Sequence, residues 1–367
     1  MRIDWMFRTS AAAVLAAALT LNGCDGEGAG AGAVGEDTPV AITVQTRWVI
    51  PPDPDQEPPL SAPLALAVDE GRERLLILEA QPPELRIYGL DGQLEATLGR
   101  EGGGPGEYTH PFDISVNARG VVAVLSMGGR VTYWSPEGNL LGTVEAGGAG
   151  LSTDILAARG DTFYVKVERF PPDDVAEFRV ATLDSVLPEP RYSDEGVPGT
   201  ESPGSTMRKH AYAVAATPAG GLLLSPPGPD YLILRFGPEG DTQPAIRRTE
   251  IGPLRRSPED IEVIEERIRK RFAELGGNLP ADFEVSASRS HIARLSIAPD
   301  STIWALTLRG ADSVAIIDAF DKRGGYTATY KLDIVASEIA VDSERLYALA
   351  VGDLGVAGVA VADRPDR

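Results

Sequence analysis

The chain contains three histidines, and each stands immediately before a short apolar run with the composition of a β-strand. They are His110, His210 and His291. Imidazole nitrogens are common ligands of Zn²⁺, and three of them leave a fourth coordination position for water. If the three strands start around one axis, the pattern predicts a divalent metal such as zinc in a lyase or hydrolase. The alternative is that the histidines are ordinary residues at the starts of strands and that no cofactor is bound.

No other catalytic motif is found in the sequence. It has no Gly-x-Ser-x-Gly elbow, no His-Glu-x-x-His zinc motif and no EF-hand-like loop. One cysteine excludes a disulfide framework and a metal site built from several thiolates. Acidic residues outnumber basic ones by 54 to 34, which gives a net charge of −20 and argues against nucleic acid as a partner.

The segments that must position these histidines repeat along the chain. Short apolar and β-branched runs are separated by turns rich in Gly, Pro, Asn and Asp. The turns Asp91-Gly92 and Glu137-Gly138 occupy the same place in the first two units and lie 46 residues apart. Six such units, most of them with four strands, predict an all-β, six-bladed β-propeller. A β-sandwich is the main competing fold, but it gives no reason for this period.

The sixth unit has only three strands before the chain ends. A further strand is available at the other end of the fold, in Val40–Ile50, where apolar and polar residues alternate. Pairing the first strand with the last unit closes the ring and removes exposed sheet edges. We therefore expect a propeller that is closed by its N-terminal strand.

One insertion has the period of a helix. Ser257 is a good N-cap, and Pro258 stands at the first helical position. Apolar residues then recur on one helical face. They are Ile261, Ile264, Ile268, Phe272 and Leu275. The sequence predicts an amphipathic helix at about 257–276 that lies across a face or flank of the propeller.

A glycine-rich run lies between the first two units. It reads Leu-Gly-Arg-Glu-Gly-Gly-Gly-Pro-Gly-Glu-Tyr from Leu98 to Tyr108, and Pro111 and a strand follow it. No helix follows, so the glycines suit a tight crossover between blades better than a phosphate site. The run resembles a loop of bacterial six-bladed propeller lipoproteins related to NHL-repeat proteins, and the resemblance extends over about Pro63–Leu332. That family is largely of unknown function, so the resemblance implies the fold.

The first residues have the layout of a secretory signal. Arg2 and Arg8 precede an apolar run, Ala11–Leu21, which is too short to span a membrane as a helix. The run ends in Leu-Asn-Gly-Cys, which resembles the lipobox of bacterial lipoproteins and implies acylation of Cys24. We predict a signal peptide at 1–23, a flexible tether at 24–39 and the propeller at 40–367.

These features lead to two functional hypotheses from different classes. The first is a non-enzymatic, lipid-anchored scaffold in the bacterial cell envelope, facing the periplasm or the exterior, that binds a protein, peptide or glycan. The residues predicted to bind are Glu107 and Tyr108 in the glycine-rich run, and Asp113, Arg208 and Tyr212 at the rim of the channel. The alternative is the metal-dependent lyase or hydrolase, whose histidines resemble those of peptidyl-α-hydroxyglycine lyases, which are also NHL-like propellers. A purely structural envelope component is a third interpretation.

Overall fold

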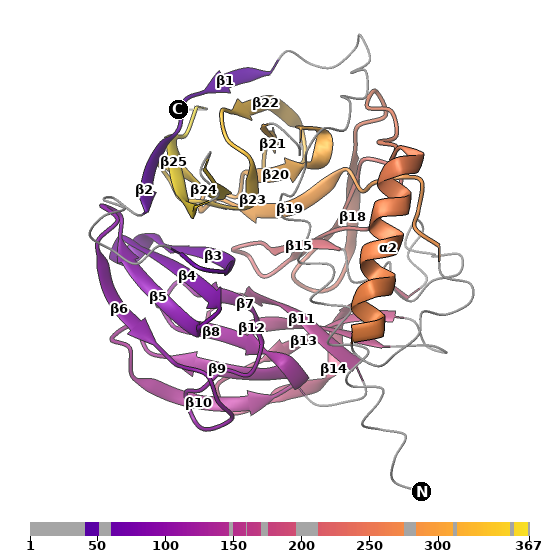
Figure 1. Cartoon of the computed structure of the whole chain (residues 1–367). Helices are drawn as coiled ribbons and strands as arrows, with labels where there is room; N and C mark the ends of the chain where they lie inside the picture. Colours follow the sequence, from indigo (N-terminus) through magenta and orange to yellow (C-terminus); the bar gives the residue numbers. More distant parts are fainter. Residues whose placement is uncertain are drawn as a thin grey trace, which may run out of the picture.

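The computed structural model contains six sheets arranged around a central axis (Figure 1). It describes residues 41–50, 60–146, 150–158, 160–169, 175–195, 212–274, 284–310, 314–352 and 356–365. Each sheet is a blade of four or five strands that follow one another from the axis outward, and the predicted six-bladed β-propeller is confirmed. The predicted signal peptide, tether and Cys24 lie outside the described residues.

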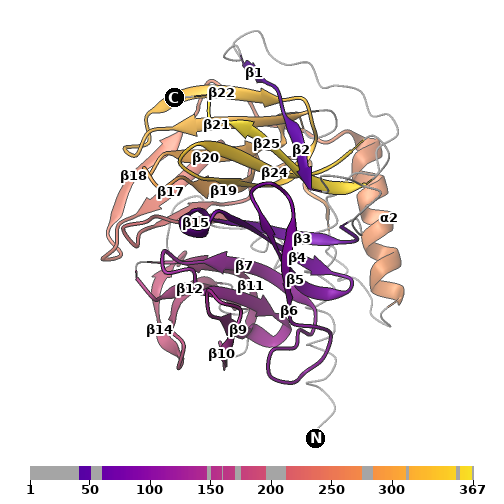
Figure 2. The ribbon, with the colours of Figure 1, turned by 90° about the vertical axis from the view of Figure 1, so that its left-hand side faces the viewer.

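The first three blades follow directly along the chain (Figures 1 and 2). Blade one contains β3 (Pro63–Asp69), β4 (Arg74–Ala80), β5 (Pro83–Gly89) and β6 (Leu94–Leu98). Blade two contains β7 (Pro111–Val116), β8 (Val122–Ser126), β9 (Arg130–Trp134) and β10 (Leu140–Glu145). Blade three contains β11 (Gly150–Ala157), β12 (Phe163–Arg169), β13 (Val175–Ala181) and β14 (Val186–Ser193).

The last three blades include the strands from the N-terminal segment. Blade four contains β15 (Ala213–Ala216), β16 (Leu222–Ser225), β17 (Leu232–Phe236) and β18 (Thr242–Arg247). Blade five contains β19 (Ile292–Ile297), β20 (Ile303–Thr307), β21 (Ala315–Phe320), β22 (Tyr326–Leu332) and the added β1 (Ile42–Val44). Blade six contains β23 (Ala336–Val341), β24 (Arg345–Val351), β25 (Ala357–Asp363) and β2 (Arg47–Ile50).

The N-terminal segment is divided between two blades. β1 runs parallel to β22, whereas β2 runs antiparallel to β25 and is the outer strand of blade six. The change of partner takes place at Thr46, whose backbone N–H and hydroxyl both donate to the carboxylate of Asp333, at 3.1 and 2.6 Å. The sequence pattern predicted one strand over this segment, and the structure has two short ones.

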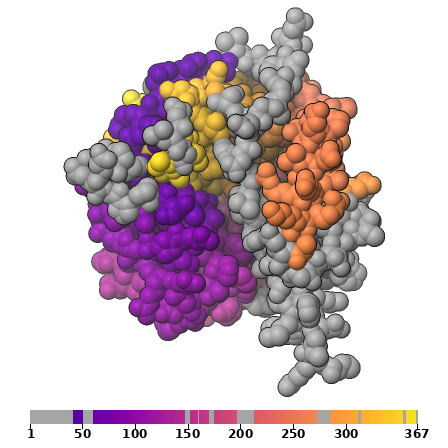
Figure 3. Space-filling model, viewed as in Figure 1, coloured from indigo at the N-terminus to yellow at the C-terminus, as the bar shows by residue number. Residues whose placement is uncertain are grey.

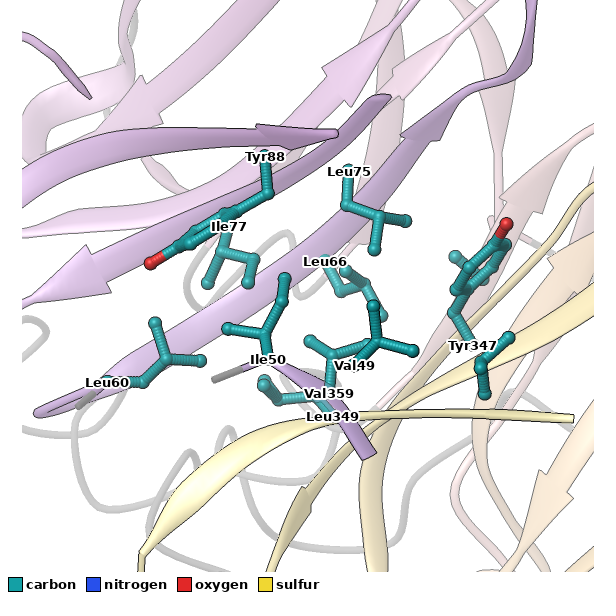
Figure 4. Close-up of a cluster of buried hydrophobic side chains, with 12 residues drawn as sticks. Val49, Ile50, Leu60, Leu66, Leu75, Ile77, Tyr88, Tyr347, Leu349 and Val359 are labelled. Carbon is teal, nitrogen blue, oxygen red and sulfur yellow. The ribbon is translucent and has the colours of Figure 1, made fainter. Parts of the chain in front are cut away.

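The core consists of clusters between neighbouring blades. Figure 4 shows the cluster at the closure, where Val49 and Ile50 of β2 pack against Leu75 and Ile77 of blade one. The hairpin turn at Gly92 has a φ of 87°, and a Cβ there would lie 1.9 Å from the carbonyl oxygen of Val49. Glycine at this turn therefore allows blade one to approach the closing strand.

One long helix, α2 (Pro258–Glu274), leaves the propeller between blades four and five. Its N-terminus is a capping box, in which the Ser257 hydroxyl accepts from the Asp260 N–H and the Asp260 carboxylate accepts from the Ser257 N–H. In Figures 1–3 the helix lies on one face of the molecule, as the sequence predicted. Within the described ranges, no helix has the length and apolar character that a membrane span requires.

Candidate functional site

A cavity of about 1420 Å³ follows the innermost strands of all six blades. Its proximal end, where the inner strands begin, includes Pro63, Phe112 and Tyr212. Its distal end, where the inner strands finish, includes Asn117 and Asp342. The cavity thus follows the propeller axis, and it is larger than the roughly 300–1,000 Å³ of a typical small-molecule site.

Most of the inner strands are interrupted near their proximal ends. The register with the next strand shifts in β3, β7, β11, β19 and β23, whereas the register of β15 with β16 is unbroken. Such bulges re-aim side chains, and they are over-represented beside active sites. At four of them a charged residue lines the cavity, and we call these residues the channel girdle. They are Asp113, Asp154, Arg294 and Glu338.

Two members of the channel girdle are joined in an ion pair. The Nε of Arg294 lies 2.6 Å from Oε2 of Glu338, which comes from the next blade. The charges of Glu338 and the other channel carboxylates raise the pKa of Arg294 and keep its guanidinium charged. Burial raises the pKa of Glu338 even though the charge of Arg294 opposes that shift.

Asp154 is held by a buried lysine. The Nζ of Lys166 on β12 is fully buried and lies 2.6 Å from Oδ2 of Asp154 and 2.9 Å from Oε1 of Glu168. The Thr153 hydroxyl donates to the same Asp154 oxygen at 2.7 Å. These contacts fix the orientation of a carboxylate that lines the channel.

Asp113 has a different environment. Its two carboxylate oxygens accept from the backbone N–H groups of Ile114 and Ile155, at 2.9 and 2.8 Å. Burial, and after it the negative charge of Asp154, raise the pKa of Asp113 well above its usual value. Asp113 therefore keeps its proton to a higher pH than an ordinary aspartate does, beside a carboxylate that is ion-paired.

This arrangement has the parts of an acid–base site. A carboxyl group whose pKa is raised can donate a proton, and a neighbouring carboxylate in a polar setting can accept one. A fixed guanidinium such as that of Arg294 can stabilise negative charge that develops on a substrate oxygen.

The two predicted histidines that the structure describes do not belong to this cluster. His291 is buried, its Nε2 lies 2.8 Å from the carbonyl oxygen of Pro229, and burial lowers its pKa. His110 is exposed, with a φ of 49°, just before β7. His210 lies outside the described residues, as does Arg208. The three-histidine site remains a prediction.

The donor set of the channel does not fit a resident metal ion. Over the described residues, no group of three or more histidines, cysteines, aspartates and glutamates is arranged to hold one. The cationic side chains of Arg294 and Lys166 already lie against Glu338 and Asp154.

Two of the predicted binding residues have structural contacts in the glycine-rich crossover. Glu107 accepts from Arg100 and from the N–H of Gly104, and these contacts lower its pKa. Tyr108 is fully buried, and its hydroxyl accepts from Nε1 of Trp134 at 2.8 Å. Its side chain is thus not accessible to a ligand.

The other predicted residues lie nearer the channel. Asp113 belongs to the channel girdle. Tyr212 lines the proximal end, but it is largely buried and its hydroxyl donates to Asp194 at 2.7 Å. Sequence reasoning missed Asp154, Arg294 and Glu338. A charged residue near the start of the first strand in several units was the available signal.

Comparisons with known proteins agree on the fold. No family model matches the chain, and no curated protein matches it either. A protein from Bacteroides fragilis that is named as an exported protein has a TM-score of 0.52 at 11% identity, over 89% of this chain and 99% of that one. A gluconolactonase from Xanthomonas campestris has a TM-score of 0.50 at 13% identity, over 83% and 88%. Regucalcin from Agrobacterium tumefaciens, a calcium-binding protein, has a TM-score of 0.48 at 9% identity, over 88% and 97%.

The prediction of a non-enzymatic scaffold is corrected by these comparisons. It was based on the absence of a catalytic motif from a propeller sequence. A gluconolactonase has the same fold, so a propeller of this shape can be an enzyme. The channel of this chain also holds charged side chains whose pKa values are raised. Both findings fit an enzyme better than a non-enzymatic scaffold, although the alternative hypothesis placed its site on a metal and the three histidines.

Proposed function

We propose that this protein is a hydrolase whose reaction takes place at the channel girdle, on an uncharged ester or lactone. The observation that carries the proposal is the pairing of Asp113, whose pKa is raised, with Asp154, which is held by Lys166. Two carboxyl groups in different environments can divide the roles of acid and base between them.

In the proposed reaction Asp154 takes a proton from water, and the water oxygen attacks the carbonyl carbon of the substrate. The guanidinium of Arg294 stabilises the negative charge on the carbonyl oxygen. The bond from that carbon to the leaving oxygen then breaks, and the leaving oxygen takes the proton of Asp113. Proton exchange with water restores both carboxyl groups.

The test is a screen of uncharged lactones and esters with the purified propeller. Lactones come first because the similar protein from Xanthomonas campestris is named a gluconolactonase. Asp113→Asn should lower kcat/KM by about 10²–10⁴ because the general acid is lost. Glu95→Gln, on the outer strand β6, is the matched control and should leave kcat/KM unchanged. Absence of turnover across the panel, or full activity in Asp113→Asn, would contradict the proposal.

A divalent metal bound by the histidines is tested separately. Elemental analysis of the purified protein should be made beside the His110→Ala/His210→Ala/His291→Ala variant. Near-stoichiometric metal that disappears in the variant would support the histidine site, and metal that persists would place its ligands elsewhere.

We also propose that Cys24 is acylated and that the tether at 24–39 holds the propeller at a bacterial membrane, within the envelope. The lipobox-like sequence supports this location. A protein, peptide or glycan of the envelope would then be within reach of the propeller as a partner. Metabolic labelling with an alkynyl fatty acid should mark the wild type and leave Cys24→Ser unlabelled.

A further inference from the structure

Helix α2 contributes directly to the cavity. Ile264, Arg267 and Ile268 line it together with the inner strands, whereas Val263 on the same helix does not and is 53% exposed. The two isoleucines therefore face the cavity. An amphipathic helix normally buries its apolar stripe against other apolar groups, and these two half-buried side chains have part of their apolar surface open to the cavity.

The helix is attached firmly at its base. The backbone N–H of Arg289 donates to the carbonyl oxygen of Leu254 at 2.8 Å, and the N–H of Arg256 donates to Ala287 at 2.9 Å. The guanidinium of Arg256 donates to the carbonyl oxygens of Ser286 and Ser288, at 2.8 and 2.7 Å. These bonds join the segment that leads into α2 to the segment that leads into β19, so the position of α2 beside the channel is defined.

Other apolar side chains at the proximal end face the same space. They line the cavity and are only half-buried, so part of their apolar surface is open to it. They are Leu64, Phe112, Pro227, Val285, Leu308 and Val335. The proximal end is thus partly apolar, and the charged channel girdle lies beside it at the bulges.

We propose that the proximal end of the channel, under Ile264 and Ile268 of α2, binds an alkyl or aryl group of the substrate. The substrate would then be a small amphiphile whose uncharged polar end reaches the channel girdle. This inference deepens the proposed function and rests on it only for the reacting end. Burial of apolar groups stabilises a complex by an amount proportional to the area removed from water.

The experiment uses n-alkyl glucosides of four to eight carbons as neutral amphiphilic probes, below their micellar concentrations, with calorimetry on the full propeller. Each added methylene should strengthen binding about fourfold over the first few carbons. In Ile264→Ser/Ile268→Ser the gain in affinity per methylene should fall well below fourfold, because part of the apolar lining is lost. Val263→Ser, the same change on the outer side of the same helix, should behave like the wild type. Circular dichroism and thermal unfolding verify that each variant is folded.

Three results would overturn the proposal: no binding by any glucoside, an affinity independent of chain length in the wild type, or an equal loss in Val263→Ser. The Asp113→Asn variant separates this proposal from the proposed hydrolysis. If no ester or lactone is hydrolysed but the chain-length dependence persists in wild type and Asp113→Asn, the apolar site stands and the assigned chemistry is wrong. If hydrolysis depends on Asp113 while chain length has no effect on binding, the proposed hydrolysis stands and the apolar site is wrong.

Discussion

Glu107 and Asp113 lie six residues apart in the chain, and their surroundings shift their pKa values in opposite directions. Glu107, in the glycine-rich crossover, accepts from the Gly104 N–H and from Arg100, and its pKa is lowered. Asp113, at the bulge of β7, also accepts from two backbone N–H groups, yet burial and the charge of Asp154 raise its pKa.

The opposite pKa shifts follow from the charges that lie beside each carboxyl group. The crossover has a cation against its carboxylate, so the ionised form of Glu107 stabilises the fold. In the channel the cations lie against Asp154 and Glu338, and Asp113 is left with a negative neighbour. Perturbed carboxyl groups in a cavity are typical of functional sites, whereas partnered ones are typical of structural sites.

The largest effect on stability is expected from Lys166→Met. The substitution removes the buried cation between Asp154 and Glu168 and leaves both carboxylates without it, which should cost about 3–5 kcal/mol of unfolding free energy. Urea unfolding measures the change. Lys322→Met, at an exposed turn of blade five, is the control and should change the free energy by less than about 0.5 kcal/mol. A loss under about 1 kcal/mol in Lys166→Met would mean that the channel cluster does not depend on this lysine.

A smaller loss is expected from Tyr108→Phe in the crossover. The indole N–H of Trp134 loses its acceptor in a buried place, which should cost about 1–3 kcal/mol. Tyr133→Phe is the matched control, because the buried Tyr133 hydroxyl has no partner among the described residues and its removal should cost little. Neither variant should change kcat/KM. A changed kcat/KM in Tyr108→Phe would show that the crossover and the channel are coupled.

The raised pKa of Asp113 should be visible in how the unfolding free energy depends on pH. Its pKa is higher in the folded state than the roughly 3.9 of an unfolded aspartate, so the folded protein binds more protons between those two values. The contribution of Asp113 to stability therefore falls as the pH rises through this window. Asp113→Asn should lack that fall and gain stability relative to the wild type above the window. Chemical unfolding at several pH values measures the difference between the two proteins. If their unfolding free energies change with pH in parallel, the raised pKa of Asp113 is contradicted.

The opposite and smallest effect is expected at Glu107. Its folded pKa is lowered, so its contribution is present above the unfolded value of about 4.3 and is lost as the pH falls through the folded one. Glu107→Gln should remove part of the acid-side loss of stability. The side chain is partly exposed, so added salt should weaken the effect. If Glu107→Gln loses as much stability at low pH as the wild type does, the opposite pKa shifts of Glu107 and Asp113 are not supported.

The sequence predicted the blades better than the site. The turn glycines and the Ser257 cap each act within a few residues, so local rules predict them, and the 46-residue period is the repetition of such local patterns. The split of the N-terminal segment at Thr46 depends on Asp333, which is 287 residues away. The channel girdle depends on bulges, and one extra residue reverses the direction of the following side chains. A single sequence shows that Arg294 and Glu338 lie near the starts of their strands, but it does not contain the register that brings them together in the channel.

The pairing of β2 with β25 also has a consequence in time. Val359 lies 309 residues after its partner Ile50, so the ring cannot close before nearly the whole chain has been made. At roughly 5–20 residues per second, β2 waits about 15–60 s during synthesis before its partner exists. Its apolar residues Val49 and Ile50, which later fill the core beside Leu75, need another cover in that interval. Blade six can therefore be completed only near the end of synthesis, whereas blades one to four form from strands that follow one another in the chain.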